Sequence, residues 1–129
     1  MEAMSRTQAA FAAPALALAL ALLTTSLAAQ EQAPNRREFT VTARDHRYAP
    51  DRLEVSQDDL VKITFSSEDR PYSFVIDALR IVKRAGAGQA VTFEFRADQP
   101  GTFTYYCNLT SDPGCRDMKG TLVVTPRPR

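Results

Sequence analysis

The chain has 129 residues and a formal net charge of +1, from 16 lysines and arginines against 15 acidic residues. This nearly equal number of basic and acidic residues excludes the basic surface that nucleic-acid binding needs. It also excludes an acidic tail for basic partners. The length allows one domain with one modest core. We therefore expect a single-domain protein that does not bind nucleic acid.

The first 29 residues have the pattern of a secretory signal peptide. Arg6 precedes an apolar run that ends near Leu23, and the small residues of SLAAQ follow at the positions that a signal peptidase reads. Cleavage after Ala28 or Ala29 would leave roughly 100 residues. A membrane anchor is the alternative, although no basic stop-transfer cluster follows the run. We expect a periplasmic or secreted protein that meets the membrane only during export.

The rest of the chain divides into a polar lead-in at 30–37, a domain at 38–125 and a proline-broken tail at 126–129. Within the domain, hydrophobic residues recur at every second position, which is the period of a half-buried strand. Turn-forming clusters such as YAPD, SQDD, AGAG and ADQPG separate the strands. In chain order, the predicted strands cover 39–43, 53–55, 61–65, 72–76, 80–82, 91–95, 101–106 and 120–124. About eight short strands without a convincing helix predict an all-β antiparallel sandwich or barrel.

Strand parity places several reactive side chains at one end of such a sandwich. If successive strands alternate in direction, the first, third and seventh connections lie at the same end. These connections are RDHRYAP, SSEDRPY and NLTSDPGCRDMK. At this end, which we call the site pole, we expect five side chains to gather: His46, Tyr72, Cys107, Cys115 and Met118.

The segments RPYSFVID, DQPGTFTYYC and PGCRDMKGTLVV resemble those of the cupredoxins, the blue-copper domains. The resemblance covers nearly the whole mature chain and implies an antiparallel Greek-key β-sandwich. In that family two histidines, a cysteine and a weak axial methionine hold copper. The resemblance places Cys107 at the thiolate position and Met118 at the axial position. Tyr72 and Cys115 stand where the two ligand histidines would be.

Composition alone excludes the ordinary blue-copper site, because His46 is the only histidine in the chain. Cys107, Cys115 and Met118 instead form a soft donor set suited to Cu(I). His46 is a candidate additional ligand, although a solvated loop position is the plainer interpretation of this residue. Tyr72 is the weakest candidate, because a phenol with a pKa of about 10 must first lose its proton. This hypothesis predicts a copper cofactor, a role in copper handling or electron transfer rather than catalysis, and a redox or copper-delivery protein as partner.

A second hypothesis makes the two cysteines a structural disulfide. Export exposes Cys107 and Cys115 to an oxidising compartment, and the Pro-Gly turn in the enclosed NLTSDPG could bring them together. Such a bond would stabilise the fold by about 2–3 kcal/mol. Met118 would then fill a gap in the core of a metal-free structural or binding domain. A thiol redox enzyme is a poorer interpretation, since reactive dithiols are usually C-x-x-C pairs at a helix N-terminus.

Overall fold

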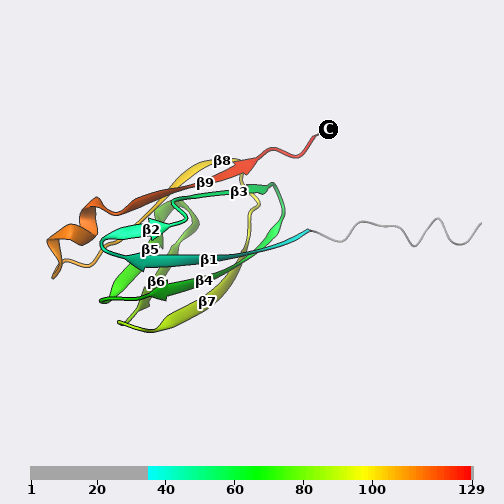
Figure 1. The fold of residues 1–129 in the computed structure, drawn as a ribbon. Helices are drawn as coiled ribbons and strands as arrows, with labels where there is room; N and C mark the ends of the chain where they lie inside the picture. Colours follow the sequence, from blue (N-terminus) through cyan, green and yellow to red (C-terminus); the bar gives the residue numbers. More distant parts are fainter. Residues whose placement is uncertain (1–34, 129) are drawn as a thin grey trace, which may run out of the picture. The chain divides into compact units, whose positions relative to one another are not determined.

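The computed structural model describes residues 35–128, which form nine strands in two sheets (Figure 1). The expected signal peptide at 1–29 lies outside the described residues. The strands are β1 (Arg36–Arg44), β2 (Arg47–Ala49), β3 (Arg52–Ser56), β4 (Leu60–Ser67), β5 (Tyr72–Ile76), β6 (Ile81–Ala85), β7 (Ala90–Arg96), β8 (Gly101–Tyr106) and β9 (Lys119–Thr125). Two short 3₁₀ turns, η3 (Asp77–Leu79) and η4 (Pro113–Asp117), follow β5 and precede β9.

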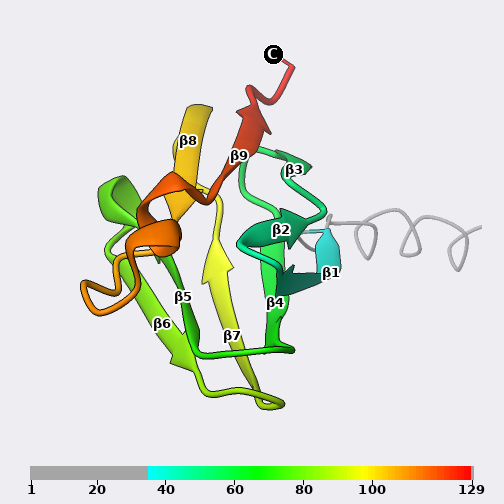
Figure 2. The same ribbon diagram turned by 60° about the vertical axis from the view of Figure 1, so that its left-hand side comes forward.

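The predicted β-sandwich is confirmed, and its sheets are mixed. One sheet has the order β2-β1-β4-β7 and the other the order β3-β9-β8-β5-β6 (Figure 2). β1 pairs parallel to β4 and β3 pairs parallel to β9, whereas the remaining pairs are antiparallel. A parallel pair needs a crossover connection. For β1 and β4 that crossover is β3, which belongs to the opposite sheet.

The predicted strands are all present, with small differences at their ends. β5 and β8 cover the predicted 72–76 and 101–106. β6 starts one residue later than predicted because Arg80, with a φ of 56°, takes the left-handed conformation that ends η3. β2 lies within RDHRYAP, which the sequence predicts to be a connection. Only Tyr48 of its three residues is buried, so the segment is too short to show the alternation of a strand.

The core lies between the two sheets and is rich in aromatic rings. Phe74, on β5, is fully buried, and its ring centroid lies 4.7 Å from that of Tyr105 and 5.7 Å from those of Phe65 and Phe93. Such pairs contribute about 0.5–1.5 kcal/mol each beyond the area that they bury. β5, which carries this ring, begins at Tyr72 beside the site pole, so the core fixes one wall of the candidate site.

Two phenols of this core keep their protons in the folded state. The Tyr48 hydroxyl donates to the Ser73 carbonyl oxygen at 2.6 Å, and the Tyr105 hydroxyl donates to the Pro50 carbonyl oxygen at 2.8 Å. Burial raises the pKa of both phenols above the ordinary value of 10.0, because a phenolate would lose its hydration there. Ionisation of either group therefore favours the unfolded chain.

We expect the free energy of unfolding to fall as the pH rises above about 10. The unfolded phenols ionise near that value and the folded ones do not, so their contribution is complete below it and is lost above it. Denaturant titrations between about pH 8 and 11 would measure the slope of the free energy of unfolding against pH. Tyr48→Phe removes one of the two groups and should make the slope shallower. An unchanged slope in that variant would contradict the assignment.

Candidate functional site

Cys107 and Cys115 form a disulfide at the site pole. Cys107 follows directly after β8, and Cys115 lies in η4; their Cα atoms are 5.1 Å apart. Their exposed fractions are 1% and 0%, so the disulfide, which closes the connection between β8 and β9, is buried. Figure 1 shows this connection, in orange, at the same end of the sandwich as the turn between β1 and β2. The disulfide that the second hypothesis requires is therefore present.

The local sequence explains why η4 forms where it brings the cysteines together. Pro113 occupies the start of the turn, where its fixed φ fits and its missing N–H is not needed. The Asp112 carboxylate accepts a hydrogen bond from the Gly114 N–H at 3.2 Å, as an N-capping side chain does. Asp112, Pro113 and Gly114 therefore set the position of Cys115.

Backbone N–H groups point at both sulfur atoms. The Ser73 N–H donates to Cys107 Sγ at 3.4 Å, and the Leu109 N–H donates to Cys115 Sγ at 3.1 Å. The Ser73 hydroxyl lies 3.5 Å from Cys107 Sγ and also donates to the Asn108 side-chain oxygen at 2.7 Å. Hydrogen bonds to a charged form favour that form, so these donors would stabilise thiolates after reduction of the disulfide.

Met118 ends η4 and lies next to the disulfide along the chain. Its N–H donates to the Cys115 carbonyl oxygen at 3.1 Å, and its side chain is 1% exposed. The thioether is therefore buried at the same pole as the two cysteine sulfurs. This burial fits both hypotheses, because a core methionine and an axial ligand are both buried.

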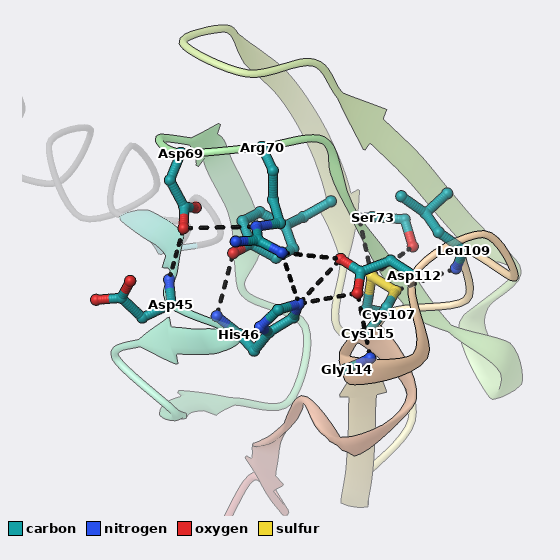
Figure 3. Close-up of polar contacts among 11 residues, drawn as sticks. Asp45, His46, Asp69, Arg70, Ser73, Cys107, Leu109, Asp112, Gly114 and Cys115 are labelled. Atoms are coloured by element: carbon teal, nitrogen blue, oxygen red, sulfur yellow. Dashed lines mark hydrogen bonds and ion pairs between the residues drawn. A yellow bond between two sulfur atoms is a disulfide. The ribbon is translucent and has the colours of Figure 1, made fainter.

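His46 contacts the connection that carries the cysteines, as Figure 3 shows. Its Nε2 lies 2.9 and 3.0 Å from the two carboxylate oxygens of Asp112. The guanidinium of Arg70 adds a contact of 3.8 Å to Asp112 and one of 3.4 Å to His46 Nε2. The hydrogen bond from His46 lowers the pKa of Asp112, so its carboxylate stays charged.

Tyr72 lies fully buried beside His46. Its hydroxyl oxygen accepts the His46 backbone N–H at 3.1 Å, and the two rings meet edge to face with centroids 5.9 Å apart. Burial raises the pKa of the Tyr72 phenol; the hydrogen bond from His46 opposes this change and the Asp69 carboxylate adds to it. The group is therefore a neutral hydrogen-bonding partner at neutral pH.

The structure places all five predicted side chains at the site pole. Direct contacts join Cys107 to Cys115 and His46 to Tyr72, and a backbone hydrogen bond joins Met118 to Cys115. Their roles as metal ligands stay predictions. Three further residues hold the site together and were not predicted from the sequence: Ser73, Arg70 and Asp112. For Asp112 a signal existed, because an aspartate before Pro-Gly is a turn-capping pattern.

The disulfide form of the site does not fit a copper ion. Both cysteine sulfurs are taken up by the S–S bond, which leaves Met118, of the sulfur-bearing side chains in residues 35–128, as the one free sulfur donor at the pole. Within residues 35–128, no three histidine, cysteine or carboxylate side chains are grouped as a metal site requires. The reduced form would offer two thiolates and a thioether, a set that suits Cu(I).

Within residues 35–128, no helix is long and apolar enough to cross a membrane.

Two facing sheets, with a cysteine-bearing connection between the last two strands, define a cupredoxin-like sandwich. The sequence profile described as a cupredoxin-like domain matches residues 15–124. The chain belongs to this family. No curated protein sequence matches it.

Several solved copper-protein structures resemble the fold. Auracyanin A, a blue copper protein from Chloroflexus aurantiacus, superposes with a TM-score of 0.59 and 17% identity over 70% of this chain and 100% of its own. The metal-binding domain of the Cu(I)-exporting ATPase of Streptococcus pneumoniae, solved with Cu(I), superposes with a TM-score of 0.60 and 15% identity. The match covers 74% of this chain and 91% of that domain. The multicopper oxidase mgLAC superposes with a TM-score of 0.58 and 21% sequence identity over 73% of this chain. The chain spans 40% of that oxidase. At these identities the likeness shows the fold.

Proposed function

We propose that this protein is an exported, periplasmic or secreted copper-binding protein, in which Cys107, Cys115 and Met118 bind Cu(I) after the disulfide has been reduced. One observation carries the proposal: these three sulfur-bearing side chains, each at most 1% exposed, lie at one pole of a cupredoxin-like domain. Thiolates and thioethers are the soft ligands that Cu(I) prefers.

Reduction is the step that would create the site. A dithiol partner supplies two electrons and two protons: one of its thiolates attacks a sulfur of the disulfide, and its second thiol resolves the mixed disulfide. The products are the two cysteine thiols and the oxidised partner. Cu(I) then displaces the thiol protons. The N–H groups of Ser73 and Leu109 support this step because they stabilise the thiolates.

Copper handling is the role that this donor set supports best. Two thiolates favour the reduced ion strongly, which suits storage or delivery of Cu(I) better than an electron transfer that cycles through Cu(II). We propose that the partner is a protein that delivers or receives copper or supplies the dithiol. We propose no catalytic role for the domain.

His46 and Tyr72 stay predicted additional ligands, and we do not include them in the proposed set. The His46 imidazole already contacts Asp112, and the Tyr72 hydroxyl already accepts the His46 N–H. Each group would have to give up that contact before it bound a metal. The sulfur atoms need only the reduction of one bond.

A second candidate function is that of a metal-free binding domain closed by the disulfide. The disulfide itself favours this candidate, as does the buried, hydrogen-bonded Tyr72 in the place of a ligand histidine. In that case Met118 is a core residue.

A thiol count and a copper titration on the same purified mature protein separate the two candidates. Thiols are counted under denaturant before and after reduction, and Cu(I) is then titrated anaerobically against a competing chelator. Tight binding of one Cu(I) by the reduced protein supports the copper site. If the reduced protein binds Cu(I) no better than an unstructured peptide with two cysteines, the copper site is excluded and the metal-free domain stands.

A further inference from the structure

We infer that His46, Asp112 and Arg70 form a latch that holds the 108–114 loop closed over the disulfide and so limits the rate of its reduction. The inference rests on the proposed function in one respect, since reduction is the step that would open the copper site. The latch itself concerns the disulfide and needs no metal. Figure 3 shows the contacts among the three side chains and, in the same view, the two cysteines.

The buried disulfide needs such an opening. Thiol–disulfide exchange requires an attacking thiolate to reach a sulfur atom, and its rate depends on access. The exposed fractions of Cys107 and Cys115 are 1% and 0%, so the closed structure blocks that approach. Of the segments around the disulfide, the 108–114 loop has mostly exposed or half-exposed residues. Its displacement is therefore the least costly route to the sulfur atoms.

The latch joins this loop to two other connections. Asp112, on the loop, contacts the imidazole of His46, which projects from the β1–β2 turn, at 2.9 Å. Arg70, from the β4–β5 connection, reaches the same carboxylate at 3.8 Å. The imidazole also packs onto Gly114: a Cβ atom there would lie 2.7 Å from two of its ring atoms. Close packing and an ion pair thus act on neighbouring positions of one loop.

The contacts of the latch are polar and partly exposed, which suits an element that opens without global unfolding. The exposed fractions of the His46 and Asp112 side chains are 31% and 22%, and that of Arg70 is 47%. Solvated pairs of this kind hold a segment only modestly, so local opening remains accessible. The core beneath, with Tyr72 and Phe74 fully buried, would stay packed during this motion.

The local geometry offers two variants that break the latch without breaking its supports. Asp112→Asn keeps an N-capping side chain for η4 but removes the charge that faces His46 and Arg70. His46 has a φ of 57°, which asparagine tolerates well, so His46→Asn keeps the backbone and the N–H bonded to Tyr72. Asparagine is too short to restore the contact that the imidazole makes with Asp112.

The test measures the rate of disulfide reduction by dithiothreitol, which becomes a cyclic disulfide as it transfers two electrons and two protons to the cysteines. Release of thiols is followed under native conditions at a low dithiothreitol concentration. We expect His46→Asn to accelerate reduction by about fivefold, the upper end of what a partly solvated pair contributes, and Asp112→Asn by a smaller factor. In denaturant, where the latch is absent, all variants should be reduced at the same rate as the wild-type protein.

Arg96→Gln is the matched control, since it removes the Arg96–Asp58 pair, which spans 3.6 Å between the end of β7 and the β3–β4 turn, at the opposite pole. Its reduction rate should stay unchanged. Equal acceleration by this variant and by His46→Asn would show that reduction follows global unfolding, and would overturn the latch. No acceleration in either latch variant would overturn it as well.

A double variant tests whether the two residues act together. Because His46 and Asp112 contribute to the same contact, the double variant should be reduced little faster than His46→Asn alone. Multiplication of the two effects would show independent roles and would contradict a shared latch. None of these rates depends on copper, so a failed Cu(I) titration leaves the latch standing, and unchanged rates leave the proposed copper site standing.

Discussion

Cys115→Ser is expected to remove tight Cu(I) binding from the reduced protein, with a rise in the dissociation constant of more than about 100-fold. Loss of residues that merely support a ligand already costs about 10–100-fold in metal affinity. Cys115 would be a ligand itself, and a serine hydroxyl is a poor donor for a soft ion. Anaerobic competition against a Cu(I) chelator measures the change.

Met118→Leu provides the comparison that separates loss of a ligand from loss of the disulfide. This substitution nearly conserves volume in a buried position, keeps both cysteines and removes the thioether. We expect weaker Cu(I) binding in the reduced variant, with the disulfide intact in its oxidised form. Wild-type affinity in this variant would exclude Met118 from the donor set.

The metal-free candidate makes the opposite prediction for Cys115→Ser. Under that candidate the substitution costs the stabilisation of the disulfide, about 2–3 kcal/mol, and changes nothing in copper affinity. If reduced wild-type protein and the variant bind Cu(I) equally, the copper site is contradicted, however unstable the variant is. Both free energies of unfolding should be measured beside the titrations.

The period-two pattern was sufficient to predict most of the sandwich. In a half-buried strand, buried and exposed positions alternate, so apolar and polar residues alternate in the sequence as well. Residues Val61, Ile63 and Phe65 of β4 illustrate this: all three are buried, with less buried residues between them. Strand parity then placed His46 and the cysteines at one pole. The parallel pairs were not predicted, because the choice of neighbour in a sheet depends on contacts between distant segments.

The missing parts of the site have a different physical origin. The contact of Arg70 with Asp112 joins two connections that are far apart in the sequence. Neither residue type indicates by itself which distant residue it will contact. Tyr72 shows the same limit: nothing in the sequence indicates that this phenol is buried and accepts the N–H of His46. The sequence also left the state of the cysteines open, since the same spacing suits a disulfide and a soft-metal site.

Gly120→Ala is expected to destabilise the fold by about 3 kcal/mol. Gly120 lies on β9 directly opposite Tyr105 of β8, and an added Cβ would stand 2.1 Å from two carbon atoms of the tyrosine ring. The ring has nowhere to move: it is fully buried, stacks on Phe74 with centroids 4.7 Å apart, and donates to the Pro50 carbonyl oxygen. For a domain of this size, the midpoint temperature of thermal unfolding should fall by about 12–24 °C.

Gly86→Ala is the matched control for this clash. A Cβ there would lie 2.8 Å from the side-chain oxygen of Gln89, which is the free end of a flexible side chain that can turn away. We expect a change within about 0.5 kcal/mol. Tyr105→Leu should cost less in the Gly120→Ala background than in the wild type, because the smaller side chain relieves the contact. Additive losses would mean that the ring is not the obstacle, and a stable Gly120→Ala variant would contradict the packing of β8 against β9.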